Sequence, residues 1–460
     1  MDFSAANTAL WNPIIQIGVI AGLILLANVL RRKIPAIRKS LIPTAVLAGF
    51  ILLVLRTAGI APVNMAFLEA VTYHALALGF IAMGLRVPSK DSSTDSLTGS
   101  KSGALIVSTY LVQAIVGLVI SLGLAYTVMP DLFKASGILL PMAYGQGPGQ
   151  ANNVGGTYEA LGMMGGRSFG LALAAAGYLC ACIVGVIYLN IFDRKKKLCR
   201  GSDRTIVSGS VTVDTFQDEG EIPVAESVDK LSVQVALVAL VYLLTYLITW
   251  GIVSLLEAVA PGLAATVSTL LWGFNFIVGS VVAMGCRVLF KGLRKAKIMG
   301  RQYQNNYLLS RISGLAFDLM IVTGIASINP EDLSGMWLPF VLMAVAGGVV
   351  TFIFLRVMCN KLYPTYTYEG FFSMYGMLTG TLSSGVLLLR EIDPNFETPA
   401  ANNLVVGSSF GIIFGAPLLV LISMAAKGEL MVWLVFGLIL IYLALLMLFI
   451  FKAGSKKAKA

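Results

Sequence analysis

The sequence predicts an all-α polytopic membrane protein with about eleven transmembrane helices in two inverted five-helix repeats, each holding a re-entrant hairpin. Three observations support this prediction. The 460-residue chain is 57% hydrophobic and only 12% charged, whereas soluble domains carry about 25% charged residues. Its apolar runs approach the roughly 20 residues that a helix needs to cross a bilayer. Two glycine-rich segments, 142–153 and 374–384, share the pattern Tyr-Gly-x-x-x-Gly.

Composition also argues against several classes of protein. The net charge of +10 comes from Lys and Arg between apolar runs, which is typical of cytoplasmic loops, so we expect no nucleic-acid partner. The five cysteines show no ligand spacing, and the single histidine, His74, does not support a histidine metal centre. The chain contains no nucleophile elbow, Walker loop or zinc signature. We therefore do not expect an enzyme.

Residues 1–192 form the expected first repeat. Its five spans are 11–30, 41–55, 68–85, 102–128 and 168–192. Basic residues directly after the first span, beginning at Arg31, place the N-terminus outside. Residues 135–166 are too polar and too rich in glycine for a lipid-facing helix, and irregular backbone survives at membrane depth only inside protein or beside water. We expect them to form a re-entrant hairpin from the outside.

Residues 193–230 are expected to be a cytoplasmic linker, and residues 231–425 the second repeat. The spans of this repeat are 233–255, 263–288, 304–328, 336–358 and 404–424, with a hairpin at 363–393. An extra span, 430–451, and a basic tail complete residues 426–460 and place the C-terminus in the cytoplasm. Because Lys and Arg collect on one side under this topology, the repeats are inverted, which is a transporter architecture.

The two hairpins carry glycines and uncharged polar side chains suited to a small solute. Half-helix N-termini attract anions, and the opposite helix ends expose carbonyls that hold Na⁺. The candidate substrate-binding residues are Gly145, Gln146, Gly147, Gly149, Gln150, Asn152 and Asn153 in the first hairpin and Gly376, Thr379, Gly380, Thr381, Ser383 and Ser384 in the second. The alternative is that the glycines are helix-packing notches.

Two charged residues extend this set of candidates. Arg167 follows the first hairpin and is either a partner for a substrate carboxylate or an interfacial anchor. Asp318 stands alone in an apolar span, where a carboxylate suggests a functional site; the alternative is a partner for Arg311. The candidate Na⁺ ligands are Asp318, Asn152 and Ser383.

These segments resemble the bacterial glutamate–sodium symporter family. The G-x-G-x-G-x-A-like run of that family is matched by residues 145–151, its second hairpin by 376–381, and the end of its third span by 80–85. Gln146 replaces a histidine that many members carry, and Pro148 interrupts the run. The resemblance implies Na⁺-coupled uptake of glutamate or a related small carboxylate across the cell (inner) membrane. It also implies a homodimer in the lipid bilayer, with Na⁺ as the coupling ion.

Two other functions compete with this expectation. One is a proton-coupled carrier of another organic anion, whose uptake does not depend on Na⁺, and the other is a passive channel, which does not accumulate solute against a gradient. A receptor or scaffold that transports nothing leaves the polar hairpins unexplained.

Overall fold

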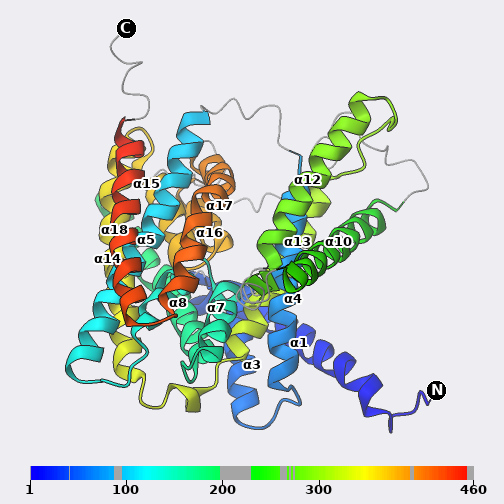
Figure 1. Ribbon diagram of the computed structural model, residues 1–460, viewed down its shortest axis with the longest axis horizontal. Helices are drawn as coiled ribbons and strands as arrows, with labels where there is room; N and C mark the ends of the chain where they lie inside the picture. The colour runs from blue at the N-terminus through cyan, green and yellow to red at the C-terminus, as the bar shows by residue number, and fades with distance from the viewer. Residues whose placement is uncertain are drawn as a thin grey trace. The chain divides into compact units, whose positions relative to one another are not determined.

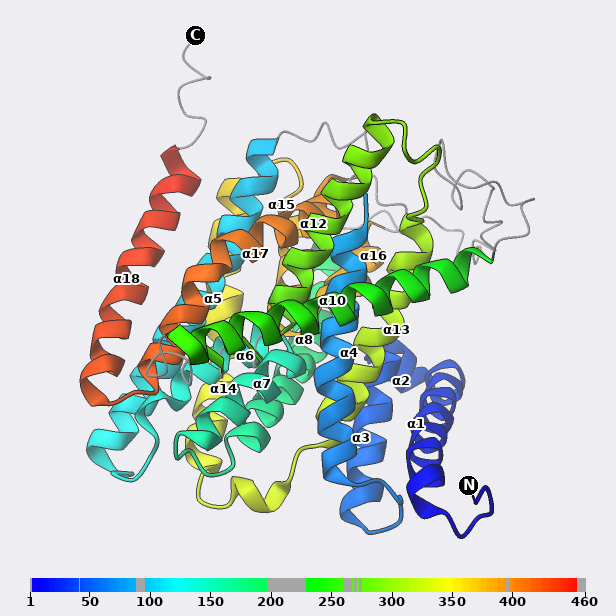
Figure 2. The same ribbon diagram turned by 45° about the vertical axis from the view of Figure 1, so that its right-hand side comes forward.

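The computed structural model describes residues 2–40, 42–87, 96–196, 229–259, 267–268, 271–272, 275–393 and 398–452. In this part of the chain the regular elements are helices, and ten of them are long and apolar enough to cross a membrane. The protein is therefore an all-α, multi-pass membrane protein, as predicted. Figures 1 and 2 show the helices from two sides.

The described elements of the first half match the predicted spans closely. They are α1 (Thr8–Lys33), α2 (Pro35–Ser40), α3 (Thr44–Thr57), α4 (Met65–Leu85), α5 (Ser96–Thr127), η1 (Lys134–Ile138), α6 (Leu139–Tyr144), α7 (Pro148–Ala160) and α8 (Gly166–Lys196). The helix α3 has 14 residues, which is shorter than the roughly 20 residues of a perpendicular span. It accounts for the difference between the eleven expected spans and the ten helices of full length.

The described elements of the second half follow the same order. They are α10 (Lys230–Val259), α12 (Asn275–Lys295), α13 (Asn306–Ala326), η2 (Pro330–Leu333), α14 (Trp337–Leu362), α15 (Thr367–Thr379), α16 (Leu382–Ile392), α17 (Ala400–Ala425) and α18 (Glu429–Lys452). The expected span 263–288 differs from α12, which extends to Lys295. Most of 263–274 lies outside the described residues, as does most of the linker 193–230. Lys297, with φ at 58°, follows the last turn of α12 and turns the chain away from the helix axis.

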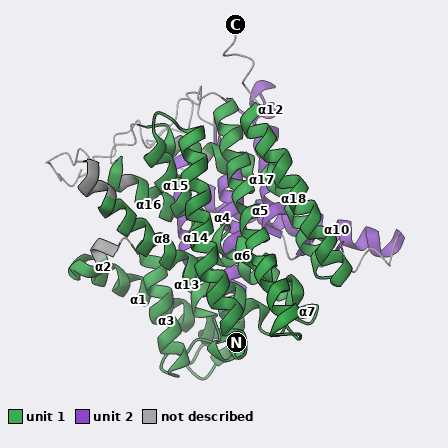
Figure 3. Cartoon of the chain, turned by 90° about the vertical axis from the view of Figure 1, so that its left-hand side faces the viewer, with its two compact units in different colours: residues 1–69, 91–200, 321–460 green, residues 70–90, 201–320 purple. Residues whose placement is uncertain are grey.

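The chain divides into two compact units, coloured green and purple in Figure 3. Unit 1 comprises residues 1–69, 91–200 and 321–460, and unit 2 comprises 70–90 and 201–320. Each unit combines segments from both expected repeats. The inverted repeat and the membrane re-entry of its hairpins remain predictions.

In unit 1, α5 packs against α14, α17 and α18, which lie side by side in Figure 1. Glycines bring these helices into backbone contact. A Cβ built on Gly103 would lie 3.0 Å from the carbonyl oxygen of Gly407 on α17, and one on Gly117 would lie 2.0 Å from the carbonyl oxygen of Gly137 in η1. Small residues permit such close approach in membrane bundles. The helix α5 thus supports η1, which leads into α6.

Unit 2 has its own apolar core between α4, α10, α12 and α13. Leu85, Val238, Ala283 and Leu309 are buried members of this core. A Cβ on Gly84 would lie 2.9 Å from the side chain of Ala283, so α4 and α12 approach closely at this glycine.

Candidate functional site

The first candidate segment is a helix broken at one glycine. The α6 pattern of hydrogen bonding continues to Gly147, whose N–H donates to the carbonyl of Ala143 at 3.1 Å. Gly147 then adopts φ +90° and ψ −176°, a region that glycine alone occupies readily. Pro148 opens α7, where its missing N–H costs nothing and its fixed φ suits the first helical residue. The Gly-Pro pair therefore determines the position of the break.

The second candidate segment breaks at Gly380 and Thr381. The helix α15 ends at Thr379, Gly380 has φ −133° and ψ −105°, and Thr381 is extended before α16 begins at Leu382. The two helices pack against each other as a hairpin: a Cβ on Gly376 would lie 2.8 Å from the Cα of Gly385.

The two breaks lie against each other. A Cβ on Gly147 would be 3.5 Å from Cγ2 of Thr381 and 3.7 Å from the carbonyl oxygen of Gly380. Gly147 and Thr381 are also the N-cap residues of α7 and α16; Gly147 has no side chain, and the side chain of Thr381 does not cap its helix. Two helix N-termini, with their unpaired N–H groups and partial positive charges, thus meet at one place.

The helix α8 passes directly beside both breaks at Gly177 and Tyr178. A Cβ on Gly177 would lie 2.3 Å from the carbonyl oxygen of Thr379, and one on Gly147 would lie 3.8 Å from the Tyr178 hydroxyl. We did not predict these two residues from the sequence. The run of small residues from Ala174 to Gly177 is the signal for such a close helix approach.

Several buried polar atoms near the starts of α7 and α16 have no hydrogen-bond partner. In the described part of the chain these are Oε1 of Gln150, Oδ1 of Asn152, Nδ2 of Asn153, Oγ1 of Thr381 and Oγ of Ser384. Gln150 and Ser384, each in the first turn of its helix, are only 1% and 3% exposed. Because buried polar groups are normally paired, this cluster is suited to a polar ligand or to bound water.

Gln113 of α5 connects the second break to α14 through hydrogen bonds. Its side-chain amide donates to the hydroxyl of Thr351 in α14 and to the carbonyl of Leu378, both at 2.9 Å. Its own carbonyl oxygen is buried without a partner among the described residues. Gln113 therefore binds one of the carbonyls that the end of α15 leaves open and keeps one acceptor free.

Some of the predicted site residues have a packing role in the structure. A Cβ on Gly145 would lie 2.3 Å from the ring of Tyr110, and Gly376 faces Gly385, so both are packing notches. The hydroxyl of Thr379 donates to the carbonyl of Tyr375 at 2.7 Å. Gln146 lies in the first break and Gly149 in the first turn of α7, while the side chain of Ser383 lies outside the described residues.

Arg167 lies away from the two breaks. Its guanidinium pairs with the carboxylate of Glu69, and its Nε lies 3.3 Å from Oε2 of Glu159. It packs beside Gly156, nine residues into α7 and about 12 Å along the helix from its start, at 1.5 Å per residue. The structure thus places Arg167 as an anchor between α8, α7 and the second turn of α4.

We expect Arg167→Gln to lower the thermal midpoint without changing the affinity of the two helix breaks for a small polar ligand. The substitution leaves two half-buried carboxylates without their cation, which costs on the order of 1 kcal/mol or more. Thermal unfolding in detergent and a solute titration on the same sample measure both effects. A large loss of affinity at unchanged stability would instead make Arg167 a solute ligand.

Asp318 is exposed on α13 and belongs to unit 2, whereas Asn152 and Ser383 belong to unit 1. The proposed three-residue Na⁺ set is therefore divided between units that are described separately. Within the described residues no group of three His, Cys, Asp or Glu side chains is placed to hold a metal ion.

No protein-family model matches this chain, and no curated protein matches it.

Proposed function

We propose that this protein is a secondary transporter that binds a small anion where the two helix breaks meet. The observation that carries this proposal is the meeting of two uncapped helix N-termini at Gly147 and Thr381. Broken helices whose N-termini point at one site deep in a membrane protein are the usual binding sites of secondary transporters. Glycine-lined packing alone does not require N-termini on both sides.

The charge of the solute follows from these helix ends. Each N-terminus carries a partial positive charge of about half an elementary charge, and two of them favour an anion such as a carboxylate. No charged side chain contributes to the described contacts of the two breaks. The backbone N–H groups of α7 and α16 are the groups that bind the anion in this proposal.

The identity of the solute follows from the uncharged groups and from the resemblance noted above. Amide and hydroxyl groups at Gln150, Asn153 and Ser384 can bind both hydrogen-bond donors and acceptors, as the amino and carboxyl groups of an amino acid require. We propose glutamate or a related small carboxylate as the solute.

Na⁺ is the coupling ion in this proposal. The last carbonyls of α15 have no helix N–H to accept from, and the carbonyl oxygen of Gly380 lies within van der Waals reach of Gly147. Such carbonyls are suited to Na⁺ in broken-helix transporters, with Oδ1 of Asn152 as a further oxygen ligand.

Both breaks belong to unit 1, so the bundle that carries them moves as one body during alternating access. From the family resemblance we further propose that the protein is a homodimer in the cell membrane. Its C-terminus lies in the cytoplasm in this proposal.

Concentrative uptake of radiolabelled glutamate into proteoliposomes tests this function. We expect accumulation with an inward Na⁺ gradient and none when choline replaces Na⁺. Accumulation driven by a pH gradient alone would instead indicate the proton-coupled carrier. Flux that never exceeds equilibrium would indicate a channel.

We expect Gln150→Leu to weaken solute binding by about tenfold to a hundredfold, because a buried polar group that binds the ligand is lost. The matched control is Thr157→Val on the same helix, whose hydroxyl donates to the carbonyl of Asn153 at 3.0 Å and lies more than two turns from the break. Thermal-shift titrations with glutamate measure both affinities. Equal affinities for the two variants would remove Gln150 from the site.

A further inference from the structure

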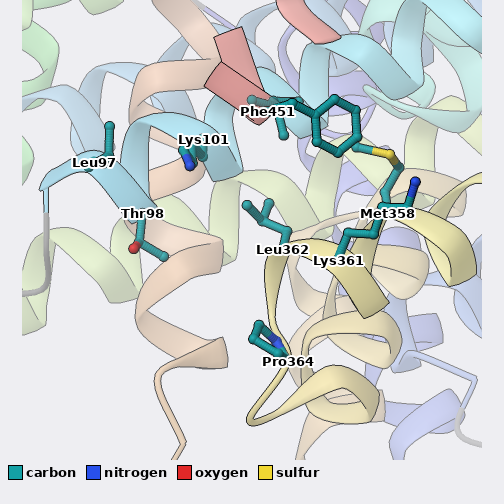
Figure 4. Close-up of a pocket in the computed structure, with 9 residues that line it drawn as sticks. Leu97, Thr98, Lys101, Met358, Lys361, Leu362, Pro364 and Phe451 are labelled. Carbon is teal, nitrogen blue, oxygen red and sulfur yellow. The ribbon is translucent and has the colours of Figure 1, made fainter. Parts of the chain in front are cut away.

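A cavity of about 330 Å³ lies in unit 1 where three helix ends come together (Figure 4). The first turns of α5 contribute Lys101, the last turn of α14 contributes Lys361, and the last turn of α18 contributes Phe451. This cavity takes no part in the site at the helix breaks. Its volume is within the range of small-ligand pockets.

Two ammonium groups define the polar side of this cavity. Lys101 is half-buried, and the Nζ of Lys361 lies 5.3 Å from the centre of the Phe451 ring. No acidic residue is among the described residues that line the cavity, and among the described ion pairs neither lysine has a carboxylate partner. In Figure 4 the two lysines flank Leu362. Two cations beside one cavity, with no carboxylate partner in the described part of the chain, favour an anion with several acceptor oxygens.

The other side of the cavity is apolar. Met358, Leu362 and Ile450 line it together with the ring of Phe451. They come from helices that are apolar enough to cross the membrane, so the cavity lies at the end of membrane-spanning segments. A free phosphate or carboxylate gains nothing from this hydrocarbon wall, whereas an amphiphile buries its chain there.

We propose that this cavity binds one anionic phospholipid. The phosphate lies between Lys101 and Lys361, and the first part of an acyl chain lies along Met358, Leu362 and Ile450. Basic pockets between transmembrane helices bind anionic head groups in this way, and the surrounding bilayer supplies the ligand. An acidic peptide is a poorer occupant, because it brings no chain that matches the wall.

The position of the cavity gives the lipid a contact with the second hairpin. Pro364 lines the cavity between the end of α14 and the start of α15, and the hydroxyl groups of Ser102 and Tyr363 lie 2.7 Å apart beside it. A bound lipid therefore braces the corner from which the second broken helix begins. This inference does not depend on which solute is transported.

Native mass spectrometry of the full-length, delipidated protein tests the proposal. Dioleoylphosphatidylglycerol, dioleoylphosphatidylcholine and inorganic phosphate are the three probes. We expect one tightly retained phosphatidylglycerol per chain, at least about tenfold weaker retention of phosphatidylcholine, and no displacement by millimolar phosphate. Displacement of the lipid by phosphate would assign the cavity to a free anion and overturn the proposal.

A pair of charge variants locates the site. We expect Lys101→Gln with Lys361→Gln to weaken retention of the tightest phosphatidylglycerol by about tenfold or more, since each basic residue near the membrane surface contributes appreciably. Lys452→Gln removes a neighbouring charge that does not line the cavity and is the matched control, with retention within about twofold of wild type. Unchanged retention in the double variant, or an equal loss in the control, would overturn the proposal.

Discussion

Gly147→Val is expected to abolish solute uptake, with a loss of at least about a hundredfold, while the protein still inserts into the membrane. Gly147 has φ +90° and ψ −176°. A residue with a Cβ is destabilised in this conformation by about 1–3 kcal/mol. A larger effect comes from position, because the new methyl groups enter the space between Gly147, Thr381 and the Tyr178 hydroxyl. Proteoliposome uptake, normalised to protein recovered in the membrane, measures this loss.

The control for Gly147→Val is a substitution at Gly162, a second glycine with a positive φ away from the breaks. Gly162 has φ +102°, follows α7, and has open space where a Cβ would be added. Gly162→Val therefore brings comparable backbone strain and no obstruction of the breaks, and its uptake is expected to stay within about threefold of wild type. Normal uptake by Gly147→Val would show that the meeting of the two breaks is not where the solute binds.

Gly177→Ala is expected to reduce uptake by about tenfold or more and to lower thermal stability. The added methyl group would lie 2.3 Å from the carbonyl oxygen of Thr379, so α8 and the end of α15 must separate. Such a displacement of backbone by even a fraction of an ångström disturbs a site that must hold its donors in place. The rate of uptake and the thermal midpoint, measured on the same preparation, test the prediction.

Gly185, two turns further along α8, provides the comparison. A Cβ there would lie 2.9 Å from a methyl group of Leu388, which is the end of a flexible side chain and can move. Gly185→Ala is therefore expected to retain most of the uptake. If both variants behave alike, the carbonyl contact of Gly177 has no special role.

Much of the helical architecture could be predicted from the sequence. Apolar runs report directly on membrane spans, and the ten long helices overlap predicted ones, although α12 extends further than its predicted span. Gly followed by Pro also interrupts a helix by local sterics alone, but from the sequence we predicted only a hairpin over 135–166 and did not place its break at Gly147. The length of α12 could not be predicted, because a helix can continue beyond the membrane. Here it ends at Lys295, just before Lys297 adopts a positive φ.

Contacts between distant segments were beyond prediction from the sequence. Arg167 and Glu69 are 98 positions apart, and nothing in either local sequence shows that they pair. The same holds for Gly177, whose importance comes from a carbonyl on α15. Local chemistry indicates which side chains can bind a solute, but the tertiary fold decides which of them meet.

The contact of α5 with η1 and α17 limits how the protein can change shape. Where Gly117 meets Gly137, main chain touches main chain, and where Gly103 meets Gly407 only the Cβ of Phe410 lies closer than the carbonyl oxygen of Gly407. Side chains between two helices can change rotamer and allow the helices to slide past each other. Backbone groups in direct contact cannot adjust in this way. We therefore expect α5, η1 and α17 to move together in any change of shape, as a block of helices and not as a single gate.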